Sequence, residues 1–214
     1  MNFSVKLDYQ IISNWIPHGN SVLDLGCGDG ELLMLLITNK QVHAQGIEIN
    51  DQAVRRCVTQ GLNVLQQDID AGLSEYAAKS IDYVILNQTL QQVKNPDFVL
   101  KEALRVGKKV IVGFPNFAHY LARLSIFFRG RVPVTAALLY EWYNTPNLHF
   151  LSIIDFVEYS RKRHITIEDN VFTAKNRKVL FLPNLRAEFG FFLLSSRQKH
   201  KERELNNNAR TRYA

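Results

Sequence analysis

The feature that most constrains the fold of this chain is a glycine-rich run that follows a stretch of apolar residues. Residues 22–31 read VLDLGCGDGE, so Gly26, Gly28 and Gly30 recur at every second position. Glycine has no Cβ, so a turn of this kind lets a ligand approach the backbone and the N-terminus of the following helix. We therefore predict a strand, a tight turn with free backbone N–H groups facing a ligand, and a helix that begins near Asp29.

The acidic residues around this turn indicate which nucleotide it binds. Asp24 lies two residues before the first glycine, where the pyrophosphate of a dinucleotide would meet a negative charge. The spacing G-x-G-x-G also differs from the G-x-G-x-x-G of dinucleotide-binding folds. Glu48 ends the next apolar run, where a carboxylate can accept hydrogen bonds from ribose hydroxyls. A ligand with an ammonium group and a ribose suits both acids, and we predict that S-adenosylmethionine (SAM) is the cofactor.

Apolar runs and helical stripes alternate along the first half of the chain. Further strands are predicted at residues 42–49, 63–66, 81–86 and 109–114. Asn95-Pro96 is a helix start and Gly107 a helix end. Residues 165–173 and 187–194 indicate a final antiparallel pair of strands. This order predicts an α/β fold with a mostly parallel sheet covered by helices on both faces.

Ligands of such sheets bind at the carboxyl ends of the strands, which predicts a role for each residue there. Asp24 would hold the ammonium group, with help from Asn87, and Glu48 would hold the ribose. Asp68 would accept a hydrogen bond from the adenine amine, while Ile49 and Ile69 pack against the ring. The turn itself contributes Gly26, Cys27, Gly28 and Gly30. The alternative for Asp68 and Asn87 is ordinary capping of a loop, and Cys27 is expected to be a small packing residue rather than a reactive thiol.

Residues 115–150 interrupt the alternation, because this stretch is too long for an ordinary link between a strand and a helix. It holds a helical stripe that ends at Gly130, then an aromatic cluster that includes Tyr140, Trp142 and Tyr143. Aromatic residues and arginine are enriched at protein interfaces. The insertion is therefore a docking face or a lid over an acceptor pocket, and the alternative is that its aromatic residues belong to the core.

Composition narrows the remaining classes. The chain has 26 Lys and Arg against 20 Asp and Glu, and residues 197–214 hold six of those basic residues against two Glu. We predict a domain over residues 1–196 and a disordered basic tail over 197–214, which argues against nucleic-acid binding. No apolar run reaches membrane-spanning length and no signal peptide is evident, so a cytoplasmic protein is expected. Cys27 and Cys57 have no metal-ligand spacing, and no metal is expected.

A series of motifs runs in one order from about residue 8 to about residue 195, and together they resemble the MetW family of methionine biosynthesis proteins. The motifs are LDLGCGDG, EIN, QQDID, LNQTLQQV, GFPNFAHY, GRVPV, YEWYNTPNLH and FLPNL. The resemblance implies a three-layer, Rossmann-like class I methyltransferase fold whose seven-stranded sheet carries an antiparallel C-terminal strand. It also implies a partner, homoserine O-acetyltransferase, which acylates homoserine.

Two functions stay open on this evidence. The chain is either a SAM-binding regulatory or accessory subunit of the acetyltransferase, or a methyltransferase acting on a small molecule. The sequence has no N-P-P-Y acceptor signature, which favours the first. His119 and His149 are the candidates for a general base in the second, and no other catalytic residue is identified.

Overall fold

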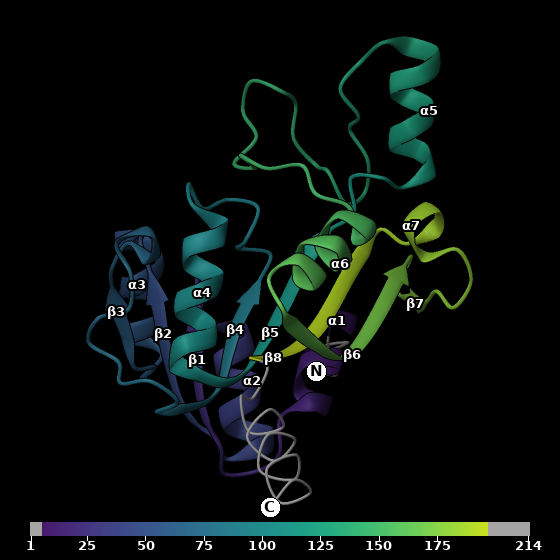
Figure 1. Cartoon of the computed structure of the whole chain (residues 1–214). Helices are drawn as coiled ribbons and strands as arrows, with labels where there is room; N and C mark the ends of the chain where they lie inside the picture. Colours follow the sequence, from purple (N-terminus) through teal and green to yellow (C-terminus); the bar gives the residue numbers. More distant parts are fainter. Residues whose placement is uncertain (1–5, 197–214) are drawn as a thin grey trace, which may run out of the picture.

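The structure of the protein is a computed structural model, which describes residues 6–196 and is built around one eight-stranded sheet (Figure 1). The strand order is β3-β2-β1-β4-β5-β8-β6-β7. The first five strands run parallel: β1 Ser21–Leu25, β2 His43–Glu48, β3 Val64–Gln66, β4 Ile81–Asn87 and β5 Gly107–Pro115. The last three are antiparallel to their neighbours: β6 Ile165–Ala174, β7 Arg177–Lys178 and β8 Phe189–Ser196. The predicted fold class is confirmed, and the two-residue β7 is an addition to it.

Helices cover both faces of this sheet, as the alternating pattern predicts. On one face lie α1 (Leu7–Trp15), α2 (Glu31–Lys40) and α3 (Asp51–Thr59), and on the other lie α4 (Pro96–Val106) and α6 (Ile153–Lys162). Neighbouring residues of one strand pack on opposite layers: Ile85 of β4 packs with α1 and α2, whereas Val84 packs with α4 and α6. Burial on both faces explains why the central strands read as continuous apolar runs.

Local sequence signals lie at the ends of α4 and α6. The α4 helix begins at Pro96 and ends at Val106, with Gly107 as its C-cap, and Ser152 forms a capping box with Asp155 at the start of α6. The α2 helix begins at Glu31 rather than near Asp29, because Gly30 has a left-handed φ of 78° and ends the turn. Asp29 instead forms an ion pair of 2.6 Å with Arg56.

The insertion projects beyond the carboxyl edge of the parallel strands (Figure 1). It begins with α5 (Tyr120–Arg129), continues without regular secondary structure to residue 152, and returns to the sheet at α6. Ala122 is the buried residue of α5, whereas Phe127 is 80% exposed, and Trp142 in the following segment is 71% exposed. The interpretation of these aromatic residues as core is therefore wrong.

Two further sequence predictions concern the basic tail and membrane-spanning segments. The predicted basic tail at 197–214 lies outside the described residues. Within residues 6–196, no helix combines the length and the apolar character that crossing a bilayer requires.

Candidate cofactor site

The predicted cofactor residues lie where the order of the sheet reverses. From β1 the chain passes to β2 and β3 on one side, and it later returns to β4 on the other side of β1. Asp24 lies in β1 next to its carboxyl end, while Glu48 and Asn87 are the last residues of β2 and β4. Crevices at such switch points are where α/β sheets bind their ligands. The fold thus brings these three side chains to one edge.

The backbone of the glycine turn is bound to its neighbour β2 rather than free. The N–H groups of Gly26 and Cys27 both donate to the carbonyl oxygen of Ile47, at 2.7 and 3.1 Å. The N–H of Gly28 donates to Oε2 of Glu48 at 2.8 Å, and the N–H of Gly30 to the carbonyl of Cys27 at 3.0 Å. The prediction of free N–H groups is wrong for these four residues. Buried backbone donors need partners, and β2 supplies most of them.

The glycines differ in what surrounds them. Gly26, Gly28 and Gly30 all have positive φ, at 77°, 54° and 78°. A Cβ on Gly26 would lie 2.7 Å from Cγ2 of Thr89, whereas a Cβ on Gly28 would meet nothing within 4 Å. The free space at the glycine turn therefore lies beside Gly28. Cys27 faces inward, and its sulfur occupies the space that a Cβ on Gly46 would need. Burial raises the pKa of the Cys27 thiol, as expected for a packing residue.

Asp24 is the charged group of the site that lacks a partner. It is 3% exposed, and among residues 6–196 no group donates a hydrogen bond to its carboxylate. Burial, and then the nearby charge of Glu48, raise the pKa of Asp24 to about 7 from its ordinary value of 3.8. A buried carboxylate is costly unless a positive charge or hydrogen-bond donors compensate it. The site therefore favours a cationic ligand group at this position.

Glu48 is held at the turn by three backbone N–H groups. Its Oε2 accepts from Gly28, and its Oε1 accepts from Ile49 and Asn50, both at 2.9 Å. These bonds orient the carboxylate toward the space beside Gly28.

Of the other predicted residues, Ile49 is available to a ligand, whereas Asp68, Ile69 and Asn87 already have partners in the protein. Ile49 is 63% exposed beside Glu48, and Asp68 follows β3, but the Asp68 carboxylate accepts a hydrogen bond from Asp70 N–H at 2.9 Å and caps the short helix η1 (Ile69–Ala71). Ile69 is buried in the core, which leaves it little surface for a ligand. Asn87 turns toward α1, where its Nδ2 donates to Asp8 Oδ2 at 3.2 Å.

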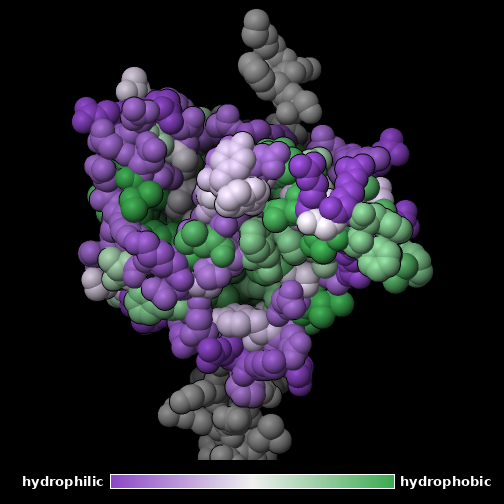
Figure 2. Space-filling model, turned by 90° about the horizontal axis from the view of Figure 1, so that it is seen from above, coloured by the Kyte–Doolittle hydropathy of each residue, from purple (hydrophilic) through white to green (hydrophobic). Residues whose placement is uncertain are grey.

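A cavity of about 650 Å³ lies beside this site, at the ends of β4 and β5. Its walls come from the start of α1, the loop after β4, the end of β6, the start of β8, and residues 136–147 of the insertion. Seen from the side of the insertion, exposed apolar residues gather around a hollow in the surface (Figure 2). Neither candidate base lines the cavity: His119 is buried, where burial lowers its pKa, and His149 Nε2 lies 3.0 Å from the carbonyl oxygen of Val93.

Sequence reasoning missed most of the cavity wall. Asp8, Gln88, Phe189 and Phe191 line it but come from three segments that are distant in sequence. The signal that could have found one of them is the polar stretch NQTLQQ directly after β4, because residues after a parallel strand reach the ligand edge.

Comparisons with known proteins place this geometry in a family. Residues 6–194 match the model of the family described as "Methionine biosynthesis protein MetW". The bifunctional methionine biosynthesis protein MetXA/MetW of Rhodopirellula baltica is 34% identical over 180 residues. That match covers 80% of this chain and 29% of the relative, so the chain spans less than a third of the relative's length.

Two solved structures illustrate how widely the fold is shared. A SAM-dependent methyltransferase from Thermotoga maritima, described as a possible histamine N-methyltransferase, has a TM-score of 0.62 at 18% identity, covering 89% of this chain and 87% of that one. The [4+2]-cyclase SpnF has a TM-score of 0.62 at 16% identity, covering 88% of this chain and 80% of that one. These similarities establish the fold, and since their described activities differ, the fold does not fix the reaction.

Proposed function

Because the chain belongs to the MetW family of methionine biosynthesis proteins, we propose that it binds SAM at the glycine turn and acts as an accessory subunit of homoserine O-acetyltransferase. The observation that carries the SAM proposal is the buried, unpartnered carboxylate of Asp24 beside Glu48. The ammonium group of SAM would compensate the first acid, and its ribose hydroxyls would donate to the second.

The space around the turn supports the same ligand. Gly28 leaves room directly beside the Glu48 carboxylate, and the exposed side chain of Ile49 can cover one face of an adenine ring. The N–H of Asp70 donates to Oδ1 of Asp68, which leaves Oδ2 as the acceptor for the adenine amine. The adenine end is therefore proposed to combine apolar contact with Ile49 and a hydrogen bond to Asp68.

The partner proposal rests on the insertion and on the fused relative. The Rhodopirellula protein joins a MetXA part and a MetW part in one chain, which favours a physical association of the two activities. In the present chain, the insertion carries large exposed side chains that include Phe127, Phe128, Trp142 and Tyr143. Apolar surface of this extent is typical of protein interfaces. Arg123, Arg129 and Arg131 lie in the same segment and suit a partner surface with acidic groups.

Titration calorimetry with SAM tests the cofactor proposal. Glu48→Ala removes a charged acceptor and is expected to weaken SAM binding by about ten- to hundred-fold. Glu158→Ala, which removes an exposed carboxylate on α6, is the matched control and should bind as the wild type does. Melting curves verify that both variants are folded. Wild-type protein that does not bind SAM, or a Glu48→Ala variant with unchanged affinity, contradicts the proposal.

Co-purification with homoserine O-acetyltransferase tests the partner proposal. The double variant Trp142→Ala and Arg131→Ala is expected to lose the association while keeping its melting temperature and its SAM affinity. The control is Phe98→Ala with Arg55→Ala, which removes an exposed aromatic residue and an arginine from α4 and α3. Retained association in the insertion variant overturns the proposed docking face.

The second candidate function is methyl transfer to a small molecule, and the cavity at the ends of β4 and β5 is the observation that favours it. Methyl transfer from a sulfonium requires mainly alignment of the two reacting groups, so a pocket beside the methyl end can suffice. Incubation with SAM labelled in its methyl group, followed by detection of a labelled product, distinguishes this function from the accessory role.

A further inference from the structure

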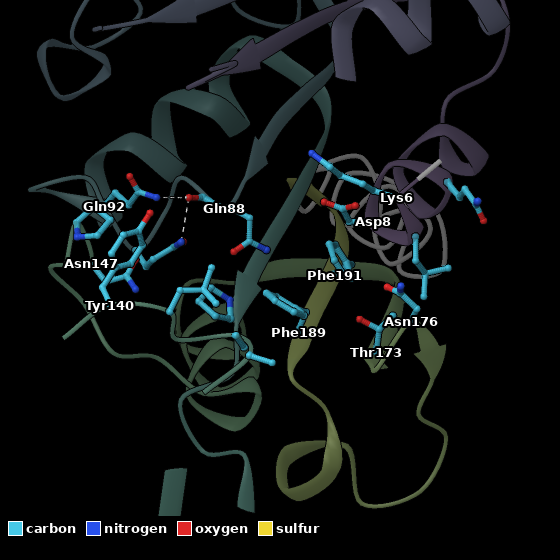
Figure 3. A pocket seen from close by; sticks show the side chains of 18 residues that line it. Lys6, Asp8, Gln88, Gln92, Tyr140, Asn147, Thr173, Asn176, Phe189 and Phe191 are labelled. Carbon is cyan, nitrogen blue, oxygen red and sulfur yellow. Dashed lines mark hydrogen bonds between the residues drawn. The ribbon is translucent and has the colours of Figure 1, made fainter. Parts of the chain in front are cut away.

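The cavity beside the cofactor site has a charged end, an aromatic floor and an amide end. Figure 3 shows Lys6 and Asp8 on one side, Gln92, Tyr140 and Asn147 on the other, and Phe189 and Phe191 between them. Its volume of about 650 Å³ falls within the range of small-molecule sites. A wall formed by residues 136–147 of the insertion separates it from solvent on one side.

Asp8 is the one carboxylate in the described lining of this cavity, and Lys6 is the one cation. The Lys6 ammonium group is already paired with Oε2 of Glu31, 2.5 Å away and outside the cavity. Asp8 has no cationic partner among the described residues, and its carboxylate accepts only the neutral amide of Asn87. The unbalanced charge at this end of the cavity is therefore negative.

The amide groups after β4 use their N–H donors within the protein. Nε2 of Gln91 and Nε2 of Gln92 both donate to the backbone carbonyl of Gln88, at 2.9 and 2.8 Å. Within the described residues, Oε1 of Gln91 and Oδ1 of Asn87 are buried and accept no hydrogen bond. Unsatisfied groups of this kind lower the stability of the protein, but both oxygens are closed to the cavity, so the amide end offers its ligand no free charged or amide acceptor from these two residues.

The backbone of Gln88, in the loop after β4, has an unusual conformation. Its φ of 60° lies in the left-handed region, which costs free energy for a residue with a side chain. This conformation places the Gln88 carbonyl where both glutamine amides reach it, and its N–H donates to the carbonyl of Gly113 at 2.8 Å. Residues with strained backbone cluster at binding sites, and Gln88 lines this cavity.

We propose that this cavity is a second ligand site, which takes a small molecule with a primary amine on an apolar body. The protonated amine is held by Asp8 at the charged end of the cavity. The apolar body lies on Phe189, Phe191 and Tyr140, whose rings also favour a nearby cation. No histidine, cysteine or serine is among the lining residues, so the site is suited to binding the amine and lacks an evident base to deprotonate it.

This site is separate from the proposed SAM site, because the cavity lining contains neither Asp24 nor Glu48. It adds a ligand to the proposed function and does not depend on it. Since residues 136–147 form one wall of the cavity and belong to the insertion, an occupant of the cavity contacts the same segment as the proposed partner.

The test compares two probes with the same apolar body. One is 3-(methylthio)propylamine, which is cationic, and the other is its N-acetyl derivative, which is neutral. We expect calorimetry or NMR titration of the full chain to give saturable binding of the amine, at least about tenfold tighter than binding of the acetamide. Equal affinity of the two probes, or no saturable binding of the amine up to about 10 mM, overturns the proposal.

Variants assign the amine to the cavity. Asp8→Asn keeps the shape of the side chain and is expected to weaken amine binding about tenfold or more. Asp51→Asn, on the exposed surface of α3, is the matched control. Asp8 lies in the first turn of α1, where a negative charge also stabilises the helix, so a second variant is needed. Tyr140→Ala, which removes part of the aromatic lining, should also weaken binding. Unchanged affinity in both cavity variants overturns the proposal.

Two further measurements separate this inference from the proposed function. Glu48→Ala should still bind the amine, since Glu48 does not line the cavity. If wild-type protein fails to bind SAM but binds the amine, the cofactor proposal fails and this one stands. If SAM competes with the amine for one site, the cavity belongs to the cofactor and the second site is wrong.

Discussion

The glycine turn and the insertion lie at the same edge of the sheet, but they satisfy their own groups to different degrees. In the turn, four backbone N–H groups are bonded to Ile47, Glu48 and Cys27, and the carboxylate of Asp24 is left without a partner. In the insertion, large apolar side chains such as Phe127 and Trp142 are left in solvent.

This difference indicates two kinds of ligand. One missing positive charge in a buried turn can be supplied by a small molecule, because a single ammonium group compensates a single carboxylate. Exposed apolar surface spread over a helix and a long segment requires a surface of similar size, which only a macromolecule provides. Three predictions, in order of decreasing effect on stability, sharpen or break this comparison.

The largest effect is expected from the same substitution made in the core and in the insertion. Phe114 is fully buried, with its ring centroid 5.7 Å from that of Phe192 and 5.1 Å from that of Phe156. Phe114→Ala should lower the free energy of unfolding by about 3–5 kcal/mol. Phe127→Ala, at 80% exposure, should change it by less than about 0.5 kcal/mol. Chemical denaturation measures both. A large loss at Phe127 would mean that the insertion has a core of its own.

The second prediction concerns the dependence of stability on pH at Asp24. Its pKa of about 7 in the folded protein lies above its ordinary value of 3.8, so between these pH values the folded state keeps a proton that the unfolded state has lost. The stabilisation is complete below about pH 4 and is lost as the pH rises through about 7. Asp24→Asn should therefore stabilise the protein by about 2–4 kcal/mol at pH 8 and change little at pH 4.

Melting curves of wild-type protein and Asp24→Asn across pH 4–8 check this prediction. Added SAM should stabilise the wild type at pH 8 and not the variant, because the variant lacks the charge that the ammonium group would meet. Equal stability of the two proteins at pH 8 would mean that Asp24 is already compensated within the protein.

The smallest effect is expected from two glycines of the turn. Gly26→Ala introduces a Cβ at a positive φ and within 2.7 Å of Thr89, and should cost about 1–3 kcal/mol. Gly28 also has a positive φ, but an added Cβ would meet no neighbour within 4 Å, so Gly28→Ala should cost about 1 kcal/mol of stability. Although it costs less stability than Gly26→Ala, it should weaken SAM binding more, because its Cβ enters the space proposed for the ligand. Denaturation and calorimetry on both variants separate folding from binding. Equal effects of the two substitutions on SAM binding would contradict the proposal that the ligand lies beside Gly28.

The regular elements follow from local patterns in the sequence. Continuous apolar runs predict β1, β4 and β5 because parallel strands are buried on both faces, and the Asn95-Pro96 pair predicts the start of α4. The edge at which Asp24, Glu48 and Asn87 lie also follows, since the carboxyl ends of parallel strands share one edge. These features depend on neighbours in the chain or on the chirality of βαβ units.

What the sequence leaves open depends on contacts between distant segments. The glycine N–H groups look free in the sequence, and only the pairing of β1 with β2 gives them Ile47 and Glu48 as acceptors. The helical stripe of α5 looks like a core stripe, and only the projection of the insertion beyond the sheet leaves it exposed. The cavity joins α1, the loop after β4, the insertion and β8, so no local pattern contains it. The sequence alone determined the sheet and the edge where the candidate cofactor residues lie, because these depend on periodicity. The tertiary structure decided which groups at that edge remain without partners, because that depends on which distant residues meet.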